Sequence, residues 1–184
     1  MHRPGTGAGI EFGGSFGGDD IAVAMLDNGD SETLHAGDGG GLSLLGAWTP
    51  LWIGNAVGVG VSGYIGFKVT EIGGSNGALK LLRFPASLSL QALLPLGGRV
   101  YLLGRAGLLK ELGVSLTGTG IASSLGTPMT APLAPQYEGG LLFESISQLA
   151  LGLSVRYASM HYEGNFGRID ASNVSILGGF YFFM

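Results

Sequence analysis

The stretch AVGVGVSGYIGFKVT, residues 56–70, alternates between two kinds of side chain at every second position. Small or polar residues stand at the even positions, and apolar residues stand at the odd ones, namely Val57, Val59, Val61, Ile65, Phe67 and Val69. Successive side chains of a β-strand point to opposite faces, so this period of two predicts a strand with one apolar face. In a soluble sandwich that face would pack on a core, whereas in a membrane barrel it would face lipid.

The composition of the whole chain favours the membrane barrel. Of 184 residues, 46% are hydrophobic and only 12% are charged, and the mean hydropathy is +0.40. No run approaches the ~20 consecutive apolar residues of a membrane-spanning helix. A chain that is apolar without an apolar run is typical of a transmembrane β-barrel, in which apolar residues occupy alternate positions.

The same composition excludes several classes of function. The net charge of −4 leaves no basic surface for nucleic acid. The chain has no cysteine and only three scattered histidines, which argues against thiolate and transition-metal sites. No Gly-x-Gly sequence opens a predicted helix, so dinucleotide binding is unsupported. We therefore expect no cofactor, no metal and no nucleic-acid partner.

Comparable alternation recurs along the chain and predicts eight strands, over residues 9–25, 39–49, 56–70, 78–93, 99–116, 136–145, 149–162 and 172–184. Most are long enough for the ~9–11 tilted residues that cross a bilayer. The connections alternate between long and short, which puts both termini on the short-turn side, periplasmic in bacterial barrels. The predicted fold is a single domain, residues 1–184: an all-β, eight-stranded, antiparallel up-and-down transmembrane barrel.

Two irregularities are expected in this barrel. The alternation slips at residues 17–20, which predicts a bulge or an early exit from the membrane. Pro85 lies inside a predicted strand, where it cannot donate to the ladder, and a closed barrel has no edge on which to place it. A local bulge at Pro85 is the expected solution.

The start of the chain carries no export signal. Met1 is followed by a Gly-rich stretch without an apolar segment. Because a barrel of this kind must be exported, we expect the sequence to be a mature form with an added initiator Met.

The chain ends in an aromatic-rich strand, Gly178-Gly179-Phe180-Tyr181-Phe182-Phe183-Met184. It resembles the C-terminal strand by which small outer-membrane barrels, the OmpA transmembrane domain and OmpX group, are recognised for assembly. In that group the last residue is usually Phe, whereas here Met184 follows Phe183. The resemblance is otherwise architectural and covers nearly the whole chain. It implies a monomer in the bacterial outer membrane, in contact with lipid and lipopolysaccharide. Aromatic residues near the short-turn end are expected to form an interfacial girdle: Trp48, Trp52, Tyr101 and Phe143.

The inward face of the predicted strands carries four acids and four bases: Glu11, Lys68, Arg83, Arg105, Glu111, Glu138, Glu144 and Arg156. The interior of a small barrel is just wide enough to be filled by side chains, so paired charges are expected there. Strand directions put four of them in a lower layer, Glu11, Arg105, Glu144 and Arg156, and the others in an upper layer. Glu144 is then the predicted partner of both arginines. The layers would form either a static polar plug or, as the resemblance to OmpA implies, a salt-bridge gate.

Two outer loops have unusual compositions. The first carries several acids, with His35 beside them, but it lacks the EF-hand pattern, so a solvated acidic loop is favoured over a Ca²⁺ site. Its acids are Asp19, Asp20, Asp27, Asp30, Glu32 and Asp38. The third loop, residues 117–135, has no charged residue. It is predicted either to fold into the barrel mouth, lie on lipid or contact a partner, or to extend its strands toward a disordered tip.

Ser159, His161 and Glu163 alternate at the top of the seventh predicted strand and share its outward face. This set resembles the outer-membrane lipid A deacylases of the PagL kind, which carry a histidine on the penultimate strand. Those enzymes place the serine two residues after the histidine, where this chain has Glu163. Residues i and i+2 of a strand are also ~7 Å apart at the backbone, far for a nucleophile and its base. Polar residues at a strand end are the favoured interpretation.

Three functions are compatible with the sequence. The favoured one is a non-enzymatic outer-membrane barrel that acts through contacts of its extracellular loops or in membrane integrity. The second is a narrow channel or a conduit for small apolar molecules, because several apolar side chains face the lumen: Leu45, Leu103, Leu109, Leu142, Met160 and Leu177. The third is a lipid A esterase.

Overall fold

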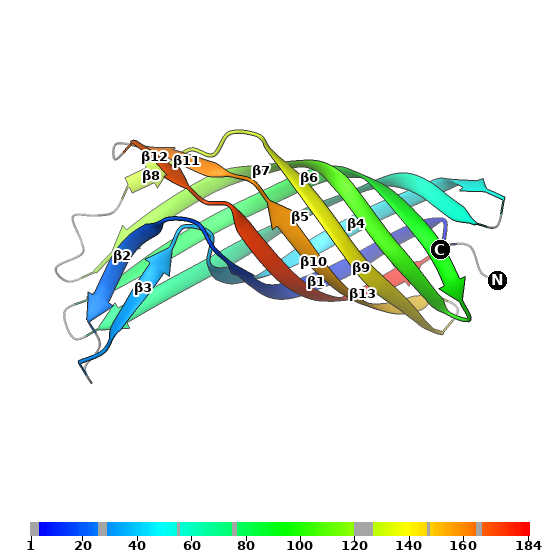
Figure 1. Cartoon of the computed structure of the whole chain (residues 1–184), viewed down its shortest axis with the longest axis horizontal. Helices are drawn as coiled ribbons and strands as arrows, with labels where there is room; N and C mark the ends of the chain where they lie inside the picture. Colours follow the sequence, from blue (N-terminus) through cyan, green and yellow to red (C-terminus); the bar gives the residue numbers. More distant parts are fainter. Residues whose placement is uncertain are drawn as a thin grey trace.

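Eight long antiparallel strands form a closed barrel (Figure 1). The computed structural model describes residues 4–25, 29–54, 56–74, 77–119, 127–146, 148–164 and 167–184. Each barrel strand pairs with two neighbours, in the order β6-β5-β4-β1-β13-β10-β9-β7, and the pairing of β6 with β7 closes the sheet. The strands are β1 (Thr6–Phe16), β4 (Gly39–Ile53), β5 (Val57–Gly74), β6 (Gly77–Gly97), β7 (Val100–Gly118), β9 (Ala134–Ile146), β10 (Leu149–Ala158) and β13 (Asn173–Phe183). The predicted eight-stranded up-and-down barrel is confirmed.

Within the described part of the chain, five short strands gather at the barrel end opposite the two termini (Figure 1). β2 (Asp20–Met25) and β3 (Ser31–His35) form one hairpin, and β11 (His161–Gly164) and β12 (Gly167–Asp170) form another. β8 (Thr127–Met129) pairs with the end of β7. We call this assembly the extracellular cap, because the long connections of bacterial barrels face outward.

The two faces of the barrel wall have opposite chemistry, as the alternation predicts. On β5, Val61, Ile65 and Phe67 are exposed, Val57 and Val59 are half-buried, and Ser62 and Tyr64 are buried in the lumen. The outward face of the other strands is equally apolar, with Leu88 and Leu90 each 68% exposed. Exposed apolar side chains all around a closed barrel are unfavourable in water and favourable in lipid. Within the described residues, no helix is long and apolar enough to span a bilayer.

The predicted irregularities are present, and several predicted boundaries need correction. The first strand breaks at Gly17 and Gly18, whose φ angles of +123° and +84° favour glycine, and the chain continues as β2. The ladder between β6 and β7 shifts at Pro85, which is the expected bulge. The expected turn at residues 49–55 is shorter, because β4 continues through Pro50 to Ile53 with a register shift after Trp48. The predicted loop at residues 71–77 is mostly strand, since β5 and β6 remain paired up to Gly74 and Gly77.

The predicted aromatic girdle is only partly outward. Trp48 and Phe143 are exposed, and Trp52 is half-buried. Tyr101, in contrast, is 2% exposed and lies in the lumen, because it stands one position out of phase with the lipid-facing residues of β7. Its assignment to the girdle was wrong.

Gly60 is a position where two strands approach too closely for a side chain. A Cβ atom there would lie 2.0 Å from the carbonyl oxygen of Trp48 and 2.7 Å from the Cα of Thr49, next to the bulge of β4. Gly60→Ala should therefore destabilise the barrel by about 1–3 kcal/mol, the usual cost of forcing extra volume into packed structure. Urea unfolding in detergent measures this. Gly104→Ala is the control, since a Cβ at Gly104 meets nothing within 4 Å. Equal effects of the two substitutions would contradict the steric argument.

Candidate functional site

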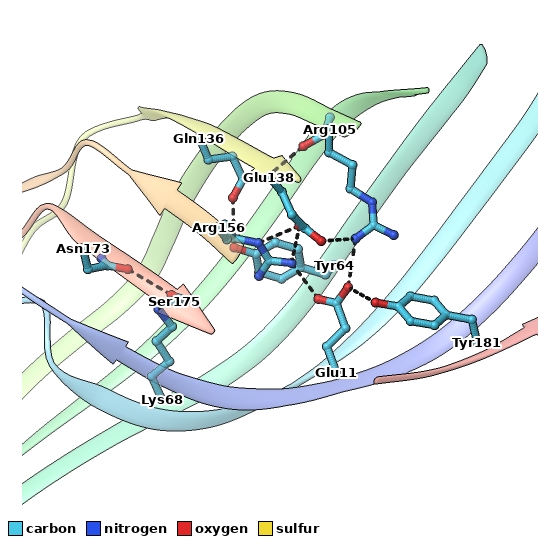
Figure 2. A network of polar contacts seen from close by, with 11 residues as sticks. Glu11, Tyr64, Lys68, Arg105, Gln136, Glu138, Arg156, Asn173, Ser175 and Tyr181 are labelled. Atoms are coloured by element: carbon cyan, nitrogen blue, oxygen red, sulfur yellow. Dashed lines mark hydrogen bonds and ion pairs between the residues drawn. The ribbon is translucent and has the colours of Figure 1, made fainter. Parts of the chain in front are cut away.

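Four charged side chains meet in the middle of the lumen and form what we call the central ionic cluster: Glu11, Arg105, Glu138 and Arg156 (Figure 2). They come from four strands, β1, β7, β9 and β10. Arg105 Nη1 lies 2.9 Å from Glu11 Oε1 and 2.9 Å from Glu138 Oε1. Arg156 Nη2 lies 2.6 Å from Glu11 Oε2 and 2.8 Å from Glu138 Oε2. Each acid therefore bridges both arginines, and the four charges cancel.

Aromatic and amide side chains surround the central ionic cluster (Figure 2). The hydroxyl of Tyr181 donates to Glu11 Oε1 at 2.9 Å. The guanidinium of Arg156 lies 4.1 Å from the ring centroid of Tyr64, a cation–π contact. The Tyr64 hydroxyl donates to Gln136, which in turn donates to Ser89. All four charged side chains of the cluster are 5% exposed or less, so it is sealed from solvent.

A second polar layer, the upper polar cluster, lies toward the extracellular cap and consists of Lys68, Arg83, Glu111 and Tyr162. Lys68 and Arg83 stand opposite each other on β5 and β6. The Tyr162 hydroxyl donates to Glu111 Oε2 at 2.9 Å and accepts from Arg83 Nη1 at 3.3 Å. Lys68 Nζ donates to Ser175 at 3.4 Å. Among the described residues, Arg83 Nε and Glu111 Oε1 have no hydrogen-bond partner.

Arg83 joins the barrel wall to the extracellular cap. Its side chain is fully buried, and its Nη1 atom donates to the carbonyl oxygen of Ala36 at 3.0 Å. Its Nη2 atom and the Thr70 hydroxyl both donate to the carbonyl oxygen of Asp38. From β1, the Ser15 hydroxyl reaches the carbonyl oxygen of Gly37 at 2.8 Å. The segment of residues 36–38 is thereby fixed inside the barrel mouth.

The periplasmic half of the lumen is filled with apolar side chains. Leu45, Leu93, Leu103 and Leu142 are each at most 5% exposed. They line a residual cavity of only about 10 Å³, which is at the lower limit of the space that one water molecule needs. The lumen is thus closed in three consecutive layers: apolar, ionic and polar.

The predicted layering of the charged residues requires one correction. Glu138, which was placed in the upper layer, is the acid that joins both arginines. Glu144, the predicted partner, lies six residues further along β9, about 20 Å at the rise of a strand. There it accepts a hydrogen bond from the Tyr101 hydroxyl at 3.5 Å. The prediction that Glu144 bridges Arg105 and Arg156 was wrong.

The structure does not arrange Ser159, His161 and Glu163 as a catalytic triad. Ser159 and Glu163 are exposed, as the alternation predicts. His161 Nε2 lies 3.4 Å from Glu163, and His161 Nδ1 lies 3.3 Å from Arg168. The His161 ring therefore contacts Glu163 and Arg168, and neither contact brings a ring nitrogen to Ser159.

Acids of the first loop contact neighbouring segments of the extracellular cap. Asp38 Oδ1 accepts from the Gly17 amide at 3.0 Å, and Asp20 lies 2.7 Å from His35. Asp19 Oδ2 accepts from the Asp170 amide, and hydrogen bonding from Ser172 lowers the pKa of Asp170 below its ordinary value. No cluster of three or more potential metal ligands occurs among the described residues. Asp27 lies outside them.

The third loop returns to the barrel mouth in its described part. Thr130 and Glu163 exchange backbone hydrogen bonds, and Lys110 donates to the carbonyl oxygen of Ala131. Met129 and Ala131 are buried, whereas Leu133 is 60% exposed. The burial of Met129 and Ala131 agrees with a loop that folds into the mouth, and the pairing of Thr127–Met129 with β7 agrees with the alternative that the strands extend. Residues 120–126 of this loop lie outside the described residues.

Comparisons with known proteins reveal similarity of structure only. No known protein family and no curated protein matches the sequence. Ail, the attachment invasion locus protein of Yersinia pestis, has 15% identity and a TM-score of 0.54 over 98% of this chain and 99% of that chain. Neisserial surface protein A has 12% identity and a TM-score of 0.56 over 97% and 96%. The outer-membrane protein OprG of Pseudomonas aeruginosa has 15% identity and a TM-score of 0.52 over 98% and 96%.

The closed barrel, its lipid-facing apolar surface and these structures together define the class of the protein. It is a transmembrane β-barrel protein with the fold of bacterial outer-membrane proteins. Within that class it has the plan of the small eight-stranded barrels that its C-terminal strand resembles.

Proposed function

We propose that this protein is a closed, non-enzymatic outer-membrane barrel that acts through its extracellular end or in membrane integrity. The observation that carries the proposal is the central ionic cluster. Four buried charges, each with two partners of opposite sign at 2.6–2.9 Å, occupy the middle of the lumen. Such a cluster is costly to open, because separating its members would leave buried charges without partners.

The remaining lumen supports the same proposal. Ions that passed the central ionic cluster would still meet the apolar layer around Leu103 and Leu142 on one side. On the other side they would meet Arg83 and residues 36–38, which fill the mouth. This sequence of barriers also argues against a continuous conduit through the lumen for small apolar molecules. The extracellular cap remains as the part of the molecule that can meet a partner.

Conductance in planar lipid bilayers tests the proposal. The purified barrel should give no stable current steps, because all three layers are closed. The double variant Glu11→Gln and Glu138→Gln leaves Arg105 and Arg156 without anionic partners, but the apolar layer and the mouth stay closed, so this variant should also remain silent. Adding Leu103→Gly, Leu142→Gly and Arg83→Ala, which thin the other two layers, should give steps. The matched control replaces Glu71 and Glu163, both exposed, by glutamine and should remain silent. Stable steps from the unmodified barrel would refute the proposed closed state.

A further inference from the structure

A second cavity lies between the extracellular cap and the barrel wall. Its volume is about 250 Å³. Leu79 of β6 and Leu116 of β7 form the wall side, and the cap contributes Ile21 and Ala22 of β2, Met129 of β8 and Ile169 of β12. Two barrel strands and elements from three separate connections of the chain therefore converge on one apolar space.

The lining of this cavity is apolar almost throughout. Leu79, Leu116 and Met129 are each 5–6% exposed, and Ile21, Ala22 and Ile169 pack on the same buried cluster. Among the described residues of the lining, Asp20 is the one with a charged side chain; it is 68% exposed and lies 2.7 Å from His35. Asp20 therefore stands at the solvent side, where its charge is hydrated and paired. A charged ligand would lose its hydration inside this cavity without gaining a partner.

We propose that this cavity is a binding site for a small uncharged apolar molecule, of the size of one or two aromatic rings. An apolar cavity of about 150 Å³ in a protein core stays dry and binds benzene, so a cavity of this larger volume accommodates a bicyclic molecule. The inference rests on the proposed function, since it names what the extracellular end binds. The central ionic cluster and the upper polar cluster close the lumen, so that the ligand enters and leaves from the outer side.

Nuclear magnetic resonance of methyl groups, with naphthalene as the probe, tests the proposal. The chain is labelled at Ile, Leu and Met methyl groups and refolded in lipid nanodiscs. Naphthalene should shift the methyl signals of Ile21, Leu79, Leu116, Met129 and Ile169 in a saturable manner and give contacts to them in nuclear Overhauser spectra. Lipid-facing methyl groups, such as those of Leu88, should shift without saturation, because the probe also partitions into lipid.

Two variants of one strand separate binding in the cavity from partitioning. Leu116→Trp fills the cavity and should abolish the saturable shifts, whereas Leu108→Trp, on the lipid face of β7, should preserve them. If Leu116→Trp does not fold, Ile169→Trp fills the same space from the half-buried edge of the cap. The inference would be overturned if the unmodified barrel gave no saturable shifts. It would also be overturned if the saturable shifts persisted in both Leu116→Trp and Ile169→Trp. A barrel that gives no current steps and no saturable methyl shifts would refute the proposed ligand site alone. A barrel that gives current steps would refute the closed state.

Discussion

Replacing Glu138 by glutamine should lower the free energy of unfolding by about 3–5 kcal/mol, the usual cost of removing one partner from a buried ion pair. Glu138 binds Arg105 and Arg156 at once, at 2.9 and 2.8 Å. Without its charge, two buried guanidinium groups share the single carboxylate of Glu11. Urea unfolding of the refolded barrel in detergent, followed by the fluorescence of its two tryptophans, measures the loss.

Glu144→Gln is the matched control for this experiment. It makes the same substitution on the same strand and the same lumen face, but about 20 Å along β9 from the two arginines. The hydrogen bond from the Tyr101 hydroxyl to residue 144 is retained in this variant, because a glutamine side-chain oxygen is also an acceptor. We expect Glu144→Gln to lower the free energy of unfolding by less than half as much as Glu138→Gln does. A larger loss for Glu144→Gln than for Glu138→Gln would contradict the assignment of the central ionic cluster.

The direction of the side chains could be predicted from the sequence because it depends on a local rule. The period of two assigns Val61 to lipid and Tyr64 to the lumen without any knowledge of the neighbouring strands. The same rule also placed all eight charged residues on the inward face. For Tyr101, proximity to a turn favours the aromatic girdle, but its odd position on β7 places it in the lumen, and parity is the rule that holds.

The pairing of the charges depends on the register between strands, which the sequence contains only in part. Glu138 and Arg156 face each other on β9 and β10, two paired strands that one short connection joins. Counting outward from the predicted connection, residues 146–148, identifies this pair. Glu11 reaches them from β1, which is separated from β10 by β13, and no short turn connects β1 with β9 or β10. Its contact depends on the register of several strands, which no local pattern of the sequence encodes.

The extracellular cap was the least predictable part, since its main contacts are with backbone atoms. The sequence predicts Arg83 in an ionic layer, but its Nη atoms donate to the carbonyl oxygens of Ala36 and Asp38 and to the Tyr162 hydroxyl. Every residue has a carbonyl group, so the sequence gives no sign of which one a buried arginine will bind. The cap therefore depends on a side chain whose role only the fold reveals.

Replacing Arg83 by methionine should release residues 36–38 from the barrel mouth while the barrel itself stays folded. The substitution preserves apolar volume but removes the donors to two buried carbonyl groups. Hydrogen bonds from a charged donor contribute about 1.5–3 kcal/mol each. The amides of Ala36 and Gly37, which donate to Asp19 and Gly17 at 2.8 Å, should exchange with deuterium about 30-fold faster, as a loss of about 2 kcal/mol in opening free energy implies.

Lys80→Met provides the control for this last experiment, because it removes a cation from the same strand at an exposed position. Lys80 lies 3.6 Å from Glu71, and both side chains are more than half exposed, so their pair contributes at most about 1 kcal/mol. Amide exchange at residues 36–37 should be unchanged in this variant. In Arg83→Lys, the exchange rate at residues 36–37 should lie between those of Lys80→Met and Arg83→Met. A lysine retains the charge but lacks the planar guanidinium that reaches two carbonyl groups at once. Unchanged exchange in Arg83→Met would show that Ser15 and Thr70 hold the segment without the arginine.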